Sequence, residues 1–157
     1  MERIDRIRPL EAADVEAVLA ITAASPEAAS WSRQDYQAML ADPARRCWVA
    51  EREGRVVGFL CFRMIGEEAE LLNLAVLPSC RRQGIAFRLM EQALREATER
   101  GAAAMFLEVR DSNVPARRLY ERLGFEPCGR RPGYYATPPA DAFLLRRRLP
   151  RSIESRS

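Results

Sequence analysis

Residues 71–86 read Leu-Leu-Asn-Leu-Ala-Val-Leu-Pro-Ser-Cys-Arg-Arg-Gln-Gly-Ile-Ala, an apolar run that stops at a turn and restarts as a helix. A turn that opens a helix points unpaired backbone N–H groups at one spot, and the helix dipole adds positive charge there. Gly84 and Ala86 lack bulk, so the backbone can approach a phosphate closely. The stretch therefore predicts a diphosphate site, with a solvated helix cap at Arg81 and Arg82 as the alternative.

The composition is that of one soluble globular domain. The chain has 157 residues, of which 48% are hydrophobic and 30% charged, which is enough to bury a core and too apolar for a disordered chain. We expect a single domain over residues 1–150 and a flexible polar tail over 151–157. The charged start of the chain and the absence of a long apolar segment indicate neither a signal peptide nor a membrane span. We therefore expect a cytoplasmic protein with no membrane partner.

The residue types present narrow the possible chemistry. The sequence contains no histidine, which excludes Ser-His-Asp and Cys-His nucleophiles and most zinc sites. Its four cysteines, Cys47, Cys61, Cys80 and Cys128, form no C-x-x-C pair, so we expect reduced thiols and no metal. All 25 basic residues are arginine and the net charge is only +3, which does not indicate direct nucleic-acid binding. Any acid or base must be Asp, Glu, Tyr, Cys or water.

Hydrophobic periodicity and turn signals predict a mixed α/β (α+β) chain of about seven strands and four helices. The expected order is strand, two helices, three strands, helix, strand, helix and two strands. The strands are expected at 3–8, 47–51, 55–64, 67–76, 103–109, 125–130 and 142–149, and the helices at 11–24, 32–41, 84–100 and 113–123. Residues 131–139 are expected to form a loop that is rich in Pro and Gly.

This order and the Arg-x-x-Gly-x-Ala motif at 81–86 resemble the GNAT superfamily of acyl-CoA-dependent N-acetyltransferases over nearly the whole chain. Within it, the chain is most similar to the RimI group, which acetylates the N-terminal alanine of a small-subunit ribosomal protein. The matching blocks are Trp31-Ser32, Asn73 to Val76, Arg82-Gln83-Gly84, Leu107 to Arg110, Ser112-Asn113, Leu119-Tyr120-Glu121, Leu123-Gly124-Phe125 and Tyr134-Tyr135. The resemblance implies a mixed sheet with a bulge and a splay beside the strand that ends at Val76.

The resemblance implies that acetyl-CoA is the co-substrate, bound without a metal. Its contacts are expected from Leu74, Ala75, Val76, Arg81, Arg82, Gln83, Gly84, Ile85, Ala86, Phe87 and Asn113. Plain strand packing is the alternative, or an additional, role for residues 74–76. One departure from the group matters: Phe87 stands where a basic residue is frequent, so we expect one cationic contact to CoA to be missing there.

Two residues are the candidate acid and base. Glu108 is the candidate base, because it lies in an otherwise apolar strand where burial would raise its pKa toward a working range. The resemblance also implies that the base is at this position. A structural ion pair with Arg110 or another arginine is the alternative. The resemblance implies that Tyr120 is the acid for the CoA sulfur, which is feasible because a phenol titrates at about 10 and a thiol at about 8.5. The sequence pattern alone indicates a core aromatic residue at Tyr120, and this is the alternative.

The acceptor is less well defined. The resemblance implies that the acceptor is the N-terminus of a peptide, from a small-subunit ribosomal protein, and that Trp31, Tyr134 and Tyr135 hold it. Alternatively, Tyr134 and Tyr135 could pack within their own loop. Arg146 to Arg148 could steer a partner, but a strand with solvated arginines, at a sheet edge, is the simpler interpretation. We expect a monomer or weak dimer. The alternatives are a GNAT enzyme for another amine (lysine, polyamine, amino acid or aminoglycoside) and a non-catalytic acyl-CoA-binding module.

Overall fold

The computed structural model describes residues 6–136 and 139–150 and contains a seven-stranded sheet in the order β1-β2-β3-β4-β5-β7-β6. Neighbouring strands are antiparallel except β4 and β5, which are parallel. The strands are β1 (Arg6–Pro9), β2 (Arg45–Arg52), β3 (Arg55–Ile65), β4 (Glu68–Val76), β5 (Ala104–Arg110), β6 (Glu126–Ala136) and β7 (Pro139–Arg148). The helices are α1 (Val15–Ala23), α2 (Arg33–Ala41), α3 (Ile85–Glu99) and α4 (Val114–Arg122), with two 3₁₀ turns, η1 (Ala12–Asp14) and η2 (Pro78–Cys80). The predicted fold class and element order are confirmed.

Local sequence signals explain where several elements begin and end. Ser32 and Asp35 form a reciprocal capping box at the start of α2, with distances of 3.1 and 2.8 Å between side-chain oxygen and backbone nitrogen, and Asn113 caps α4. Glu53 and Gly54 both adopt positive φ, 53° and 72°, as a two-residue turn between antiparallel strands requires. These features are local, which is why the sequence predicted them.

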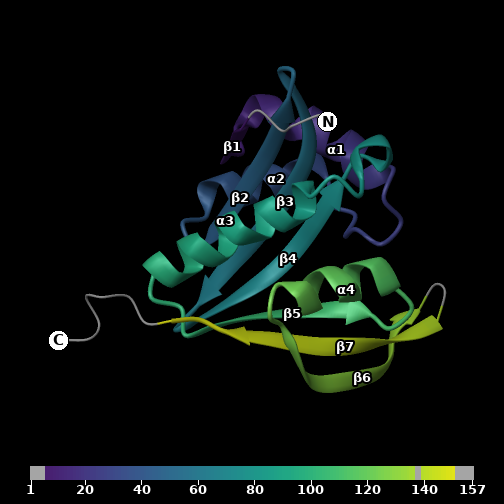
Figure 1. Ribbon diagram of the computed structural model, residues 1–157. Helices are drawn as coiled ribbons and strands as arrows, with labels where there is room; N and C mark the ends of the chain where they lie inside the picture. The colour runs from purple at the N-terminus through teal and green to yellow at the C-terminus, as the bar shows by residue number, and fades with distance from the viewer. Residues whose placement is uncertain (1–5, 137–138, 151–157) are drawn as a thin grey trace.

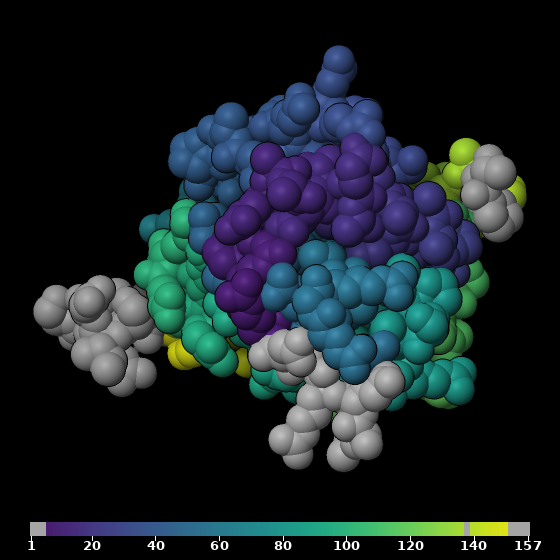
Figure 2. Space-filling model, turned by 90° about the horizontal axis from the view of Figure 1, so that it is seen from above, coloured from purple at the N-terminus to yellow at the C-terminus, as the bar shows by residue number. Residues whose placement is uncertain are grey.

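The sheet is covered on both faces by helices. In Figure 1, α3 and α4 lie in front of the sheet and α1 and α2 behind it, and each pair of helices closes a separate apolar core. Figure 2, seen from above, shows the N-terminal part of the chain (purple and blue) gathered over one side of the molecule. The most completely buried large side chains include Leu89, Met90 and Met105 in the first core and Val18, Tyr36 and Phe59 in the second.

The sheet splits between β4 and β5. These strands pair only where Glu68 to Glu70 face Ala104 to Phe106, and beyond that point they separate (Figure 1). Leu72 is the extra residue of a β-bulge in β4, because the partners Cys61 and Phe62 on β3 face Asn73 and Leu71. A bulge bends its strand and increases the local twist, which directs the end of β4 away from β5.

Two expectations about the C-terminal strands were wrong. Tyr134 and Tyr135 belong to β6 rather than to a loop, because the strand continues through a bulge in which residues 132–134 lie opposite Asp141. The carboxylate of Asp141 accepts hydrogen bonds from the Gly133 N–H and from Arg130 Nε, both at 2.8 Å, and so holds the bulge. In addition, β7 with its three arginines lies between β5 and β6, so it is not an edge strand.

Some expectations fall outside the described ranges. Residues 3–5 of the first expected strand, residues 137–138 of the expected loop and the expected tail at 151–157 belong to these parts. The longest helix, α3, has 15 residues. No helix in the described ranges combines the length and apolarity that crossing a bilayer requires.

Candidate active site

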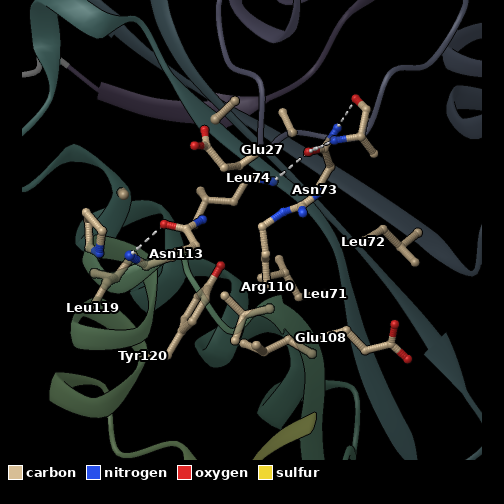
Figure 3. A pocket seen from close by; sticks show the side chains of 18 of the residues that line it. Glu27, Leu71, Leu72, Asn73, Leu74, Glu108, Arg110, Asn113, Leu119 and Tyr120 are labelled. Carbon is tan, nitrogen blue, oxygen red and sulfur yellow. Dashed lines mark hydrogen bonds between the residues drawn. The ribbon is translucent and has the colours of Figure 1, made fainter. Parts of the chain in front are cut away.

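An open cleft of about 1370 Å³ begins where β4 and β5 separate. Its walls come from β4, the start of α3, the second half of β5, α4 and β6. Figure 3 shows the side chains that line it. The cleft therefore joins the predicted phosphate turn at one end to the tyrosines of β6 at the other.

The wall formed by β4 presents its backbone to the cleft. Leu77 N donates to Val57 O at 2.9 Å, and hydrogen bonds to the neighbouring strand alternate along an antiparallel pair. The register of β3 and β4 therefore turns the backbone groups of Ala75 toward β3 and those of Leu74 and Val76 toward the open side. A strand edge of this kind can hydrogen-bond an extended ligand that carries amide groups.

Asn73 holds one rim of the cleft. Its buried side chain accepts a hydrogen bond from Ala29 N at 3.2 Å and donates one to Ala29 O at 3.1 Å. It also accepts from Leu74 N at 3.0 Å, as the dashed lines in Figure 3 show. The loop after α1, whose residues 25–29 line the cleft, is thus fastened to β4. Sequence reasoning gave Asn73 no role, although a polar residue inside an apolar run was the available signal.

The phosphate turn has the backbone geometry that its sequence predicts. Arg82 and Gly84 both adopt positive φ, 63° and 80°, which lets the chain turn sharply from η2 into α3. Gly84 is the N-cap of α3; no side chain caps this end, and the first turn of α3 contains no acidic residue. The amides of Ile85, Ala86 and Phe87 are therefore available for an anion at a positive helix end.

Two side chains predicted to contact the cofactor are bound within the protein. Arg81 donates to Val76 O at 3.3 Å and to Ser25 Oγ at 3.1 Å. Gln83 accepts from Arg52 at 2.6 Å and is absent from the described lining of the cleft, whereas Arg81 belongs to it. These contacts brace the turn from both sides.

Glu108 reaches the cleft from β5 and is held by residues of β6. Its side chain is 26% exposed, so it is less buried than the sequence suggested, and its Oε1 lies 3.3 Å from Arg131 Nη2. A hydrogen bond to Glu108 raises the pKa of the Tyr134 hydroxyl, and the Arg131 guanidinium lies 5.5 Å from the centroid of the Tyr134 ring. An arginine partner was expected for Glu108, and Arg131 is one; the pair lies at the edge of the cleft.

Tyr120 lies on α4 with its ring in the core and its hydroxyl at the cleft. The residue is 7% exposed, and its ring packs edge-on against Phe125 at a centroid distance of 5.7 Å. Figure 3 shows the Tyr120 hydroxyl pointing toward the middle of the cleft, whereas the carboxylate of Glu108 points away from Tyr120. Burial raises the pKa of the Tyr120 phenol well above its usual value, and the nearby Tyr135 contributes. The phenol therefore stays protonated at physiological pH, and full proton transfer to a thiolate is less favourable than the ordinary value of about 10 implied.

The remaining predicted residues divide between the cleft and its surroundings. Tyr134 and Tyr135 lie side by side with ring centroids 5.1 Å apart, and Arg110 stacks on Tyr135 at 4.3 Å. Asn113 lines the cleft, and its side-chain oxygen caps α4. Within the described ranges, Trp31 is not a lining residue of the cleft; it packs on Tyr36 and Phe59 beside a small neighbouring depression.

Several residues of the cleft were not predicted. Arg131 at the Glu108 end carries no sequence signal, because it comes from β6, which is separated from β5 by β7 in the sheet. Arg118 and Arg122 of α4 also line the cleft, and Arg122 lies over Phe87 at the start of α3. The helical spacing of α4 does not show which other helix these residues face. In the described part of the chain, no group of three or more Cys, Asp or Glu side chains is placed to hold a metal ion.

Comparison with known proteins agrees with this geometry. Residues 15–125 match the model of the acetyltransferase (GNAT) family. A Bacillus subtilis (strain 168) protein with the provisional name [ribosomal protein bS18]-alanine N-acetyltransferase is 30% identical over 140 residues, which cover 88% of this chain and 92% of the relative.

Solved structures share the fold. The crystal structure of the ribosomal-protein-S18-alanine N-acetyltransferase from Escherichia coli superposes with a TM-score of 0.82 at 29% identity, covering 97% of this chain and 98% of the other. Arabidopsis thaliana NAA60 in complex with acetyl-CoA has a TM-score of 0.80 at 20% identity, over 91% and 97% of the two chains, and shows likeness of fold alone. The chain thus belongs to the acetyltransferase (GNAT) family.

Proposed function

We propose that this protein transfers the acetyl group of acetyl-CoA directly to the α-amine of an N-terminal alanine on a small-subunit ribosomal protein. The observation that carries the proposal is the cleft: an uncapped helix end at one end, the phenol of Tyr120 in the middle and the carboxylate of Glu108 at the other end. The two relatives named for alanine N-acetylation of protein S18 support this choice of acceptor. We place the enzyme in the cytoplasm as a monomer or weak dimer, without nucleic-acid or membrane partners.

The cleft fits acetyl-CoA without a metal. A diphosphate is an anion that helix-start amides favour, and the start of α3 has neither a capping side chain nor a first-turn carboxylate to compete with it. Gly84 has open space where a side chain would stand. The outward carbonyl of Leu74 and the outward N–H of Val76 can receive the amides of the pantetheine arm, whereas Leu74 N already donates to Asn73 and Val76 O already accepts from Arg81.

Glu108 acts on the acceptor amine. An α-amine has a pKa of about 8 and a lysine side chain about 10.4, so an N-terminal amine needs little help to lose its proton. Glu108 accepts this proton directly or through a water molecule, while Arg131 and Tyr134 fix the direction of its carboxylate. No covalent enzyme intermediate is needed, and the absence of histidine from the sequence is no obstacle.

Tyr120 acts on the departing sulfur. Acetyl-CoA, when bound, supplies a thioester to the middle of the cleft. There, the outward N–H of Val76 on β4 would donate to the carbonyl oxygen and stabilise the negative charge that develops. The Tyr120 hydroxyl, protonated at working pH, donates to the sulfur as the carbon–sulfur bond breaks.

The direct test measures acetylation and CoA release together. Mass spectrometry of peptides that begin with Ala, compared with the same peptides blocked at the α-amine but carrying lysine, should show acetylation of the free N-terminus alone. A thiol reagent should detect one CoA per acetyl group. Acetylation of an aminoglycoside, polyamine or lysine with none of the Ala peptides would favour another amine, and tight acetyl-CoA binding without thiol release would favour the non-catalytic module.

Two variants test the assigned roles. Glu108→Gln should lower turnover by about 10²- to 10⁴-fold, the usual contribution of a general base, and Tyr120→Phe by about 10- to 10²-fold, the worth of a hydrogen bond to a charged group. Both variants should bind acetyl-CoA nearly as the unmodified chain does. Loss of acetyl-CoA binding in both would show that the two residues are structural.

A further inference from the structure

The phosphate end of the cleft contains an arginine that stands in for a missing basic residue. Phe87, in the first turn of α3, occupies the position where the sequence analysis expected a cationic contact to be lost. The structure places Arg122 over this ring, with the guanidinium carbon 5.1 Å from the ring centroid. The last turn of α4 thus supplies a cation beside residue 87.

A second arginine accompanies it. Arg118 precedes Arg122 by four residues, so both side chains lie on the same face of α4, and both line the cleft and are exposed. Among the residues that the structure describes, neither guanidinium has a carboxylate within 4.0 Å. Two like charges held together without a counter-ion indicate a place for an anionic ligand group.

CoA carries phosphate at two places, and the cleft offers two kinds of anion site. The diphosphate matches the amides at the start of α3, which supply helix-end N–H groups at the turn itself. The arginines approach from α4, with Arg122 over the ring of Phe87. They can therefore reach a phosphate that the amides of α3 do not hold.

We propose that Arg122, assisted by Arg118, binds the ribose 3′-phosphate of CoA. This inference rests on the proposed use of acetyl-CoA and adds a residue-level contact to it. The ring of Phe87 supports the flat guanidinium and limits its motion, since arginine stacks on aromatic faces. Phe87 thus helps the 3′-phosphate contact by positioning Arg122, although it carries no charge itself.

The test compares acetyl-CoA with 3′-dephospho-acetyl-CoA by isothermal titration. The unmodified chain should bind acetyl-CoA about fivefold more tightly than the dephospho compound, the upper value for an exposed ion pair. Arg122→Gln should remove most of this preference by weakening acetyl-CoA alone. Phe87→Leu, which keeps an apolar side chain but removes the stacking surface, should remove part of it.

The matched control is Arg95→Gln, an equal loss of charge on the exposed face of α3, outside the described lining of the cleft. It should leave the preference unchanged. Equal weakening of both compounds by Arg122→Gln would mean that Arg122 meets another part of CoA, and no weakening would mean no contact; either result overturns the inference. Failure of the unmodified chain to bind either compound would overturn the proposed function as well, so the two failures are distinguishable.

Discussion

Gly58→Ala should displace the start of α3 and weaken acetyl-CoA binding, although Gly58 is not itself among the described lining residues of the cleft. A Cβ at Gly58 on β3 would lie 3.0 Å from Ile85 Cγ2 and 3.1 Å from Leu89 Cδ1, inside the optimum of about 3.5–4.0 Å for two carbon atoms. Both side chains are buried, at 3% and 0% exposed, and Ile85 is β-branched and cannot turn away easily. The helix must therefore move by a few tenths of an ångström.

The cost follows from these contacts. Overpacking a core costs about 1–3 kcal/mol, and two contacts that are only moderately short place Gly58→Ala at the lower end, about 1–2 kcal/mol. For a domain of this size each kcal/mol lowers the melting temperature by about 2–4 °C. Because Ile85 is the first residue of α3, its amide moves with the helix, and we expect the acetyl-CoA dissociation constant to rise about threefold.

The assay pairs calorimetric melting with titration of acetyl-CoA, and Gly101→Ala is the matched control. Gly101 lies just after the other end of α3, at φ 88° with nothing within 4 Å of a new Cβ. Forcing alanine into this left-handed conformation costs about 1–2 kcal/mol. Gly101→Ala should therefore lose about as much stability as Gly58→Ala, but without displacing the phosphate turn. A Gly58→Ala chain that melts and binds like the unmodified chain, or a Gly101→Ala chain that loses the same affinity, would refute the reasoning.

Three further predictions concern other contacts. Hydrogen bonds from Arg8, and also from the Glu11 N–H, lower the pKa of Asp14. The contribution of Asp14 to stability is therefore present above its usual pKa of about 3.9 and is lost as the pH falls through the lowered value. In urea unfolding from pH 5 to pH 2, Asp14→Asn should lose less stability with falling pH than the unmodified chain, and an equal loss in both would contradict this. Ser32→Ala should cost about 1 kcal/mol by removing the cap of α2, measured by urea unfolding at pH 7. Arg131→Gln should lower kcat/KM for an Ala peptide while acetyl-CoA titrates normally, because Arg131 directs the carboxylate of Glu108; unchanged kinetics would show an idle ion pair.

Most of the fold could be predicted because its signals are local. Caps such as Ser32 and Asn113, the Glu53–Gly54 turn and the apolar spacing of α3 each depend on residues within a few positions of one another. The phosphate turn belongs to the same class, since Gly84 and the uncapped amides after it are adjacent in sequence. A resemblance to GNAT proteins then indicated how these pieces assemble.

The parts that could not be predicted depend on register and on contacts between distant elements. A bulge of three residues opposite Asp141 let β6 continue through an expected loop, and the strand order β5-β7-β6 placed Arg131 near Glu108. No periodicity reports such a shift, because each strand keeps its own alternation on either side of the bulge. Burial at Tyr120 is a second case: the aromatic pattern indicated a core residue, but its raised pKa follows from the depth at which α4 packs.

The cleft depends both on local sequence signals and on contacts between distant elements. The turn proposed to bind the diphosphate is formed by residues adjacent in sequence, whereas the groups at the two flanks, Arg122 at one end and Arg131 at the other, are both positioned by packing between separate elements. A substitution of either arginine leaves the phosphate turn intact and changes only what the cleft prefers at that end. Cofactor choice and acceptor choice can therefore vary independently in this fold. The effects of substituting Arg122 and Arg131 on the free energies of binding and catalysis should add in the double variant, since the two residues share no contact in the described structure.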